Sequence, residues 1–425
     1  MKRRPWIWIV GGTLLVVLAL GGLYLSQQIG DPSGWPLEAQ AWNREHSVPE
    51  SDNAGPLYQR IGIAAPWGYR RLQVDWTLPM AVTELSALQA VRESPSFPEQ
   101  EALLKEAVGR PSCFYPLDPG KEVFMTSRAP LFQLQRLTCY LTLNAQSETS
   151  RGNPGEGLKS LLTAARVGFH HAQGEIITQL VGTACRGMAW AAFERLATDS
   201  APDPEALDSA ADELDRLAAG RPSAKGMLEL SALNNRAALE AFYRPDGFSK
   251  LGKFENDEVS PLQSTAQWLK EAALHPLPRC RRDLEEAQAL LSKEPLSAAD
   301  QARLNALLSG SGKILKDLLL PWMLKCGQSL RRELACERGT RILLRLRAHR
   351  LRKGAYPETL AGLGKALPDD PYTGKPFIYK KLEGDKFLLY STGPDGKDDG
   401  GATDSRDFPV FPKGADMLFG RPPQP

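Results

Sequence analysis

The sequence has 425 residues, of which 42% are hydrophobic and 24% are charged, and its formal net charge at pH 7 is +2. These proportions are typical of a globular protein and exclude a disordered or fibrous chain. The length leaves room for about three domains. Because the net charge is close to zero, composition gives no reason to expect a nucleic acid partner.

The N-terminus predicts a membrane anchor. Lys2, Arg3 and Arg4 precede the uncharged stretch Pro5–Ser26, and about 20 apolar residues are enough to cross a bilayer as a helix. The basic residues would keep the short tail in the cytoplasm, so the bulk of the chain would lie outside it. A signal peptide cleaved near the small-x-small triplet 19–21 is the alternative.

The middle of the chain predicts a helical domain. Residues 27–57 are rich in Pro, Gly, Ser and Asn, which is typical of a linker, and helical patterns dominate from 58 to 335. Two amphipathic runs, 130–145 and 158–172, flank a Gly/Pro turn and predict a helical hairpin that resembles a single tetratricopeptide-type unit. Further helices are expected at 97–108, 175–197, 203–220, 227–243, 260–274, 280–293, 297–310 and 313–354.

Several motifs in this region are incomplete. The segment "SGSGKI" lacks the Gly at 307 and the Ser or Thr at 314 that a phosphate-binding loop requires. His170 and His171 are adjacent, so they would point about 100° apart on a helix, and we interpret them as structural or solvated. The nine basic residues between Arg331 and Lys353 fit either an anionic partner or an ordinary helix that faces acidic neighbours, and we favour the second interpretation.

The six cysteines form neither a CxxC pair nor a cluster with histidine. This spacing argues against a zinc site and against a thioredoxin-like motif. Buried free thiols are the simplest interpretation, and one or two disulfides remain an alternative for an exported domain.

Strand patterns are concentrated near the C-terminus. The segments 375–381 and 385–391 are joined by a connector that contains a glycine, which predicts an antiparallel hairpin. Phe377 and Tyr379 would share one face, where Phe387 and Leu389 of the second strand could meet them. The expected fold is therefore mainly α, with a small C-terminal α+β module.

The loop after this hairpin, "STGPDGKDDGGATD", is rich in Asp and Gly, as calcium sites are. An EF-hand that starts at Asp395 fails, because Lys397 and Arg406 fall on ligand positions. Without a cation the aspartates would repel one another on a loop without regular backbone hydrogen bonds. We favour a metal site over a solvated surface loop.

Residues 341–404 resemble the calcium-binding periplasmic end of the major pseudopilin of type II secretion systems. The helix that ends in "KGAYP", the segment "DPYTGKPFIY" and the loop "STGPDG" follow in the order found in that family. The resemblance implies a calcium site, and the carried-over ligands are Leu389 through its carbonyl, Ser391, Asp395, Asp399 and Asp404. An extra residue, Asp398 or Asp399, shifts the following glycine pair from the family's pattern.

The remainder of the chain resembles membrane-anchored bacterial proteins without an assigned activity. The expected organisation is a tail and anchor at 1–26, a linker at 27–57, an α-helical domain at 58–335, a pseudopilin-like module at 336–407 and a Pro-rich tail at 408–425. We expect a single-pass protein of the bacterial inner membrane with a non-enzymatic scaffold or docking role, a protein partner and bound calcium. The alternative is an envelope enzyme whose site is built from residues distant in sequence.

Overall fold

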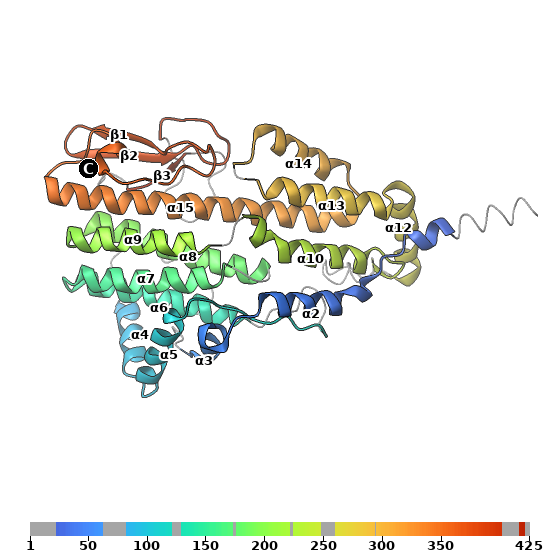
Figure 1. Ribbon diagram of the computed structural model, residues 1–425, viewed down its shortest axis with the longest axis horizontal. Helices are drawn as coiled ribbons and strands as arrows, with labels where there is room; N and C mark the ends of the chain where they lie inside the picture. The colour runs from blue at the N-terminus through green and yellow to red at the C-terminus, as the bar shows by residue number, and fades with distance from the viewer. Residues whose placement is uncertain are drawn as a thin grey trace, which may run out of the picture.

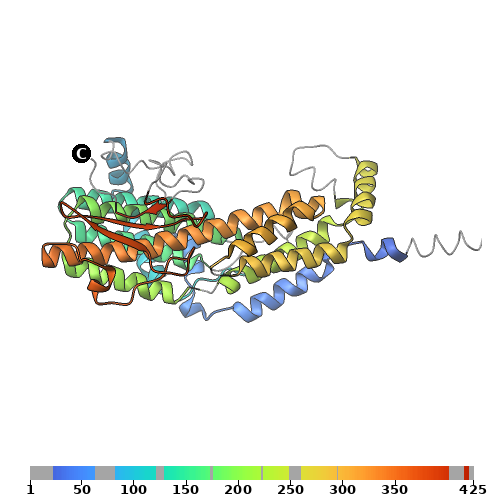
Figure 2. The ribbon, with the colours of Figure 1, turned by 90° about the horizontal axis from the view of Figure 1, so that it is seen from above.

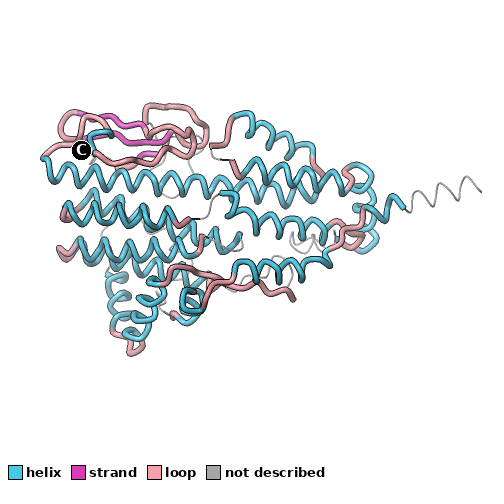
Figure 3. Tube along the Cα trace, viewed as in Figure 1, coloured by secondary structure: helices cyan, strands magenta, loops and turns pink. Residues whose placement is uncertain are grey.

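The computed structural model describes residues 23–62, 82–120, 129–172, 176–221, 224–247, 260–293, 295–401 and 416–420. The fold is mainly helical, with one small antiparallel sheet near the C-terminus, as expected from the sequence (Figures 1 and 3). The helices are α2 (Trp35–His46), α3 (Gly55–Arg60), α4 (Val82–Arg92), α5 (Phe97–Gly109), α6 (Leu131–Ser150), α7 (Pro154–His170), α8 (Ile176–Asp199), α9 (Pro204–Ala219), α10 (Ala224–Phe242), α12 (Pro261–Leu274), α13 (Leu277–Leu291), α14 (Ala298–Gly310) and α15 (Leu320–Lys353).

The predicted anchor lies mostly outside the described residues. Among the helices that are described, none is long and apolar enough to cross a membrane.

The predicted helical hairpin is confirmed as α6 and α7, which pack side by side (Figure 1). Ala164 and Ala165 of α7 are fully buried. Two local sequence signals define helix ends in the structure. Ser297 forms a capping box with Asp300 at the start of α14, and Gly354 ends α15 with a φ of 81°.

Helix α15 extends along most of the structure and contributes to two hydrophobic cores (Figures 1 and 2). A π-helical turn, Ile314–Leu319, leads into it. Its N-terminal part packs with α10, α12, α13 and α14 in one core, and its C-terminal part packs with α6–α9 in the other. The boundary expected between residues 335 and 336 therefore falls inside one continuous helix.

The strand hairpin is confirmed as β1 (Ile378–Leu382) and β2 (Lys386–Ser391), which pair antiparallel. Tyr379 lies opposite Leu389, and the turn between the strands has positive φ angles at Gly384 and Asp385. Because Phe377, Phe387 and Leu389 belong to the same buried cluster as α6–α9 and α15, the C-terminal module shares its core with the helical bundle.

A third strand, β3 (Met417–Leu418), pairs with β2. It lies within residues 408–425, the segment expected to be a Pro-rich tail. Met417 and Phe419 are buried, and their apolar side chains complete the core between the sheet and α15. The ring of Phe419 lies against Gly339 of α15, where a side chain would collide with it.

The expected linker at 27–57 is also corrected. It contains α2, and α3 begins at Gly55. Trp35 and Ala39 of α2 are buried against α10, because this Pro- and Gly-rich segment still carries apolar residues at helical spacing.

Candidate functional site

The conformation of the acidic loop after β2 depends on glycines with positive φ angles and on aspartate side chains that accept hydrogen bonds from the backbone. Positive φ angles occur at Gly393, Gly396, Gly400 and Gly401. Asp395 Oδ1 accepts a hydrogen bond from the Lys397 N–H at 3.0 Å. Asp398 Oδ1 accepts from the Gly400 N–H at 2.9 Å and from the Tyr390 hydroxyl at 2.8 Å. The hydrogen bond from Tyr390 and the bond from the Gly400 backbone hold the pKa of Asp398 below its ordinary value.

The calcium ligands that the pseudopilin resemblance implies lie in different environments. The Leu389 carbonyl already accepts the Phe419 N–H at 2.9 Å, so it takes part in the sheet. Ser391 is buried, and its Oγ accepts the Gly393 N–H at 3.1 Å. Asp395 and Asp399 are exposed on the loop, and Asp404 lies outside the described residues.

The structure adds an acid that the sequence analysis missed. Asp416, which precedes β3, is only 1% exposed, and its Oδ2 accepts the Gly401 N–H at 2.7 Å. Its Oδ1 is buried without a hydrogen-bond partner. Burial raises the pKa of Asp416, and the nearby carboxylates of Asp398 and Asp399 raise it further. No local motif marks this residue, because the contact depends on the pairing of β3 with β2.

This arrangement fits a cation in part. Calcium prefers carboxylate, carbonyl and hydroxyl oxygens, and a buried carboxylate oxygen without a partner is a suitable ligand. Within the described ranges, however, no three His, Cys, Asp or Glu side chains are gathered as a metal ion would require. The described residues thus supply Asp416 and the neighbouring loop acids as candidate ligands.

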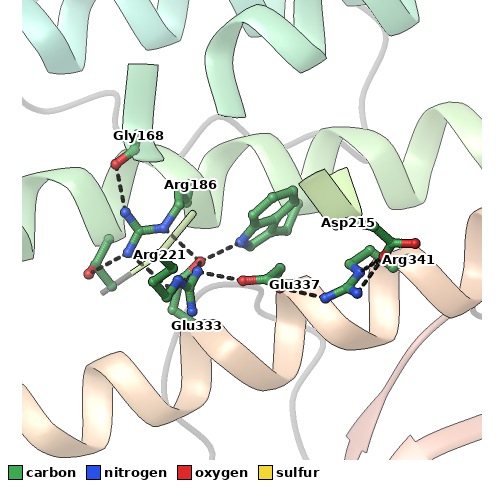
Figure 4. Close-up of polar contacts among 9 residues, drawn as sticks. Gly168, Arg186, Asp215, Arg221, Glu333, Glu337 and Arg341 are labelled. Atoms are coloured by element: carbon green, nitrogen blue, oxygen red, sulfur yellow. Dashed lines mark hydrogen bonds and ion pairs between the residues drawn. The ribbon is translucent and has the colours of Figure 1, made fainter. Parts of the chain in front are cut away.

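A second polar feature is a chain of buried charges between α8, α9 and α15 (Figure 4). Arg186 is fully buried and donates through Nε and Nη2 to the two carboxylate oxygens of Glu333, at 2.8 and 3.0 Å. Its Nη1 donates to the Gly168 carbonyl at 2.6 Å. The Trp190 Nε1–H also donates to Glu333, at 2.9 Å.

The chain continues along α15. Arg221 contacts Glu333 at 3.2 Å and Glu337 at 2.5 Å, and Glu337 contacts Arg341 at 2.9 Å. Burial alone would raise the pKa of Glu333, but Arg186 and Arg221 hold it well below the ordinary value. The charges therefore alternate in sign, and the ionised form of Glu333 is stabilised by the two arginines.

The basic face of α15 meets the acidic face of α9. Arg345 Nη2 lies 2.8 Å from Asp212, and Arg352 lies 2.9 Å from Asp208. Arg341 pairs with Asp215. The interpretation of an ordinary helix that faces acidic neighbours is confirmed for these three arginines.

His170 and His171 belong to a buried hydrogen-bonded cluster with Tyr58 and Tyr115. His171 Nδ1 lies 2.7 Å from the Val167 carbonyl, which can only accept, so Nδ1 carries the proton. Nε2 therefore accepts the Tyr115 hydroxyl at 2.9 Å. Burial lowers the pKa of His171 to about 3 and that of His170 to about 4, so both are neutral at pH 7. The structural interpretation of both histidines is confirmed.

The cysteines are free thiols, as the simplest interpretation expected. Cys113 Sγ lies 3.8 Å from His171 Nε2, but burial raises the pKa of this thiol to about 12. An imidazole with a pKa of about 3 is too weak a base to ionise it. The pair therefore lacks the electrostatics of an activated nucleophile.

A cavity of about 240 Å³ lies between α10 and α13. Its charged lining includes Arg236, which pairs with Glu38, and Arg281, which forms two hydrogen bonds with Glu240 at 2.6 and 3.0 Å. Because both cations are already neutralised by acids of the same chain, the cavity has no free positive charge on these arginines to offer an anionic ligand.

Comparison of the chain with protein-family models, with curated proteins and with solved structures gave no match. The function is therefore argued from the geometry described above.

Proposed function

We propose that this chain is a membrane-anchored scaffold or docking protein of the bacterial envelope, with a calcium-stabilised C-terminal loop. The observation that supports calcium most directly is Asp416, whose buried Oδ1 has no hydrogen-bond partner and which lies close to Asp398 and Asp399. Bound calcium would neutralise this group of carboxylates. Leu389, Ser391, Asp395, Asp399 and Asp404 remain the ligands that the pseudopilin resemblance implies.

In this proposal, two residues connect the acidic loop to the sheet. Asp416 connects the loop to β3 through the Gly401 N–H, and Tyr390 of β2 fixes Asp398 through its hydroxyl. A cation held by Asp416 and the loop acids would therefore fasten β3 to β2. Because Phe419 lies directly after β3, the same cation would support the core between the sheet and α15.

The buried ion pairs between helices support the scaffold role. Arg186, Arg221, Glu333 and Glu337 form mutual ion pairs that connect helices, which is an arrangement suited to holding a shape. A protein partner, and a link to secretion or pilus-like assembly, follow from the pseudopilin resemblance. The second candidate is an envelope enzyme, and the cavity between α10 and α13 is where its substrate would bind.

Thermal unfolding of the full chain in calcium and in chelator tests the calcium proposal. A ligand that binds only the folded state stabilises it by about 2.7 kcal/mol at a hundredfold excess over Kd. The melting temperature should therefore rise by several degrees in millimolar calcium.

Two variants sharpen this test. Asp416→Asn should abolish the calcium effect, yet it should not destabilise the calcium-free chain, because it removes a buried charge whose pKa is raised. Asp369→Asn, at an exposed aspartate of the same module, should keep the full calcium response. If calcium leaves the melting temperature of the unaltered chain unchanged, the loop is a solvated acidic turn and the proposal is wrong.

A further inference from the structure

Helix α12 has two apolar faces, and only one of them is buried. Ser264, Trp268 and Ala272, spaced four residues apart, pack into the core. A second stripe, Leu262, Ala266, Leu269 and Ala273, follows the spacing i, i+4, i+7, i+11 and is exposed to solvent. Leu262 is 82% exposed and Leu269 is 41% exposed, which is unusual for leucines on one stripe of a helix.

The chain is fastened to α12 directly after the apolar N-terminal segment. Residues 23–27 are helical, and the Tyr24 hydroxyl donates to the Ala272 carbonyl at 2.9 Å. Gln28 Oε1 accepts the Leu277 N–H at 2.8 Å. Leu23 is 58% exposed and Tyr24 is 41% exposed, so the segment that contacts α12 also exposes apolar side chains.

The orientation of α12 is also informative. Figure 2 shows α12 lying across the long axis of the protein, at the end where the described chain begins. Most of the other helices run along that axis (Figures 1 and 2). If the preceding segment crosses a bilayer along this long axis, α12 lies parallel to the membrane plane.

We propose that α12 is an interfacial helix that rests on the lipid bilayer, with the stripe Leu262–Ala266–Leu269–Ala273 inserted at the boundary between headgroups and acyl chains. This inference rests on the proposed membrane anchor, and it identifies the surface that the anchored protein turns toward the lipid. Lipid is the favoured occupant because the uncharged stretch Pro5–Ser26 leads into the residues that contact α12, through the hydrogen bond from Tyr24 to the Ala272 carbonyl. Tyr24 suits the interface, and the exposed Lys270 suits anionic headgroups.

Site-specific photocrosslinking of the full chain in proteoliposomes of phosphatidylethanolamine and phosphatidylglycerol tests this proposal. A diazirine amino acid replaces Leu262 in one sample and Leu382 in another. Leu382 is the matched control, because it is a 40% exposed leucine on the sheet, away from α12. We expect roughly tenfold more phospholipid adduct at position 262, because the stripe would be immersed in lipid while the control faces water.

A second measurement uses a diazirine at position 266, within the stripe. Leu262→Glu combined with Leu269→Glu should lower its lipid adduct to the level of position 382. The unfolding midpoint of the chain should stay unchanged, since both leucines are exposed.

Alkaline extraction of the same proteoliposomes separates this inference from the anchor. If the chain stays in the membrane but position 262 labels no more lipid than position 382, the α12 inference is wrong and the anchor stands. Adducts of position 262 with another protein chain would also overturn it. If alkali removes the chain from the membrane, the anchor is wrong and the α12 inference fails with it.

Discussion

Arg186 of α8 and Glu333 of α15 meet through two hydrogen bonds of 2.8 and 3.0 Å, with both side chains buried. Removing one partner of such a pair leaves an uncompensated charge in the interior. We expect Glu333→Gln to lower the free energy of unfolding by about 3–5 kcal/mol, because Arg186 and Arg221 would lose their counter-ion. Denaturant unfolding followed by circular dichroism measures this change.

The control for that variant is Glu286→Gln. Glu286 pairs with Arg303 at an exposed position, where an ion pair contributes about 0–1 kcal/mol. If Glu333→Gln and Glu286→Gln lowered the free energy of unfolding equally, the buried pair would not join α8 to α15 in the manner proposed.

The buried histidines predict that the free energy of unfolding depends on pH. Burial lowers the pKa of His170 to about 4 and that of His171 to about 3, whereas an unfolded histidine titrates near 6.5. Between these values the unfolded chain binds protons that the folded chain does not bind, so stability is full above pH 6.5 and falls as the pH is lowered toward 4. The loss at pH 4 is on the order of 3 kcal/mol per buried histidine.

Unfolding midpoints between pH 4 and pH 7 measure this dependence. His170→Gln should make the profile shallower, because it removes one of the two groups. His349→Gln, at a histidine of α15 outside this cluster, is the matched control. A His170→Gln profile parallel to that of the unaltered chain would contradict the assignment.

Two glycines in helices predict opposite effects of the same substitution. A Cβ at Gly339 would lie 2.5 Å from the ring of Phe419, so Gly339→Ala should displace that ring and lower stability. A Cβ at Gly187 of α8 meets nothing within 4 Å, so Gly187→Ala should raise stability by about 1 kcal/mol through helix propensity. Thermal melts of the two variants check the signs, and a stabilising Gly339→Ala would show that the C-terminal segment does not pack on α15.

The sheet core predicts protease sensitivity. Phe387 is 5% exposed. The centroid of its ring lies 4.6 Å from that of Tyr356 and 6.1 Å from that of Tyr379. Phe387→Ala should cost about 3–5 kcal/mol and open the C-terminal region to limited proteolysis. Leu382→Ala, at a 40% exposed position of β1, should leave the digestion pattern unaltered.

Local signals in the sequence were enough to predict most helices and the strand hairpin. The spacing of Leu134, Leu137 and Leu141 marks the buried face of α6, and the glycine in the connector marks the turn between β1 and β2. Long-range contacts could not be predicted in this way. Arg186 and Glu333 are 147 residues apart, and neither belongs to a motif that would indicate their pairing.

The candidate site also combines residues that local sequence patterns indicate with a residue that only a long-range contact brings in. The aspartates and glycines of the loop are visible as a pattern, whereas Asp416 joins them only because β3 pairs with β2. A two-residue strand in a Pro-rich segment has no periodicity, so its burial depends on tertiary packing alone.

The position of α15 along the chain has a consequence for the order of folding. Its 34 residues form a rod about 51 Å long, and they are synthesised after residues 1–319. Neither hydrophobic core can close until this rod is present, since each core lacks one wall without it. We therefore expect the earlier helices to remain loosely associated while the chain is being made, and the two halves of the protein to reach their final packing together.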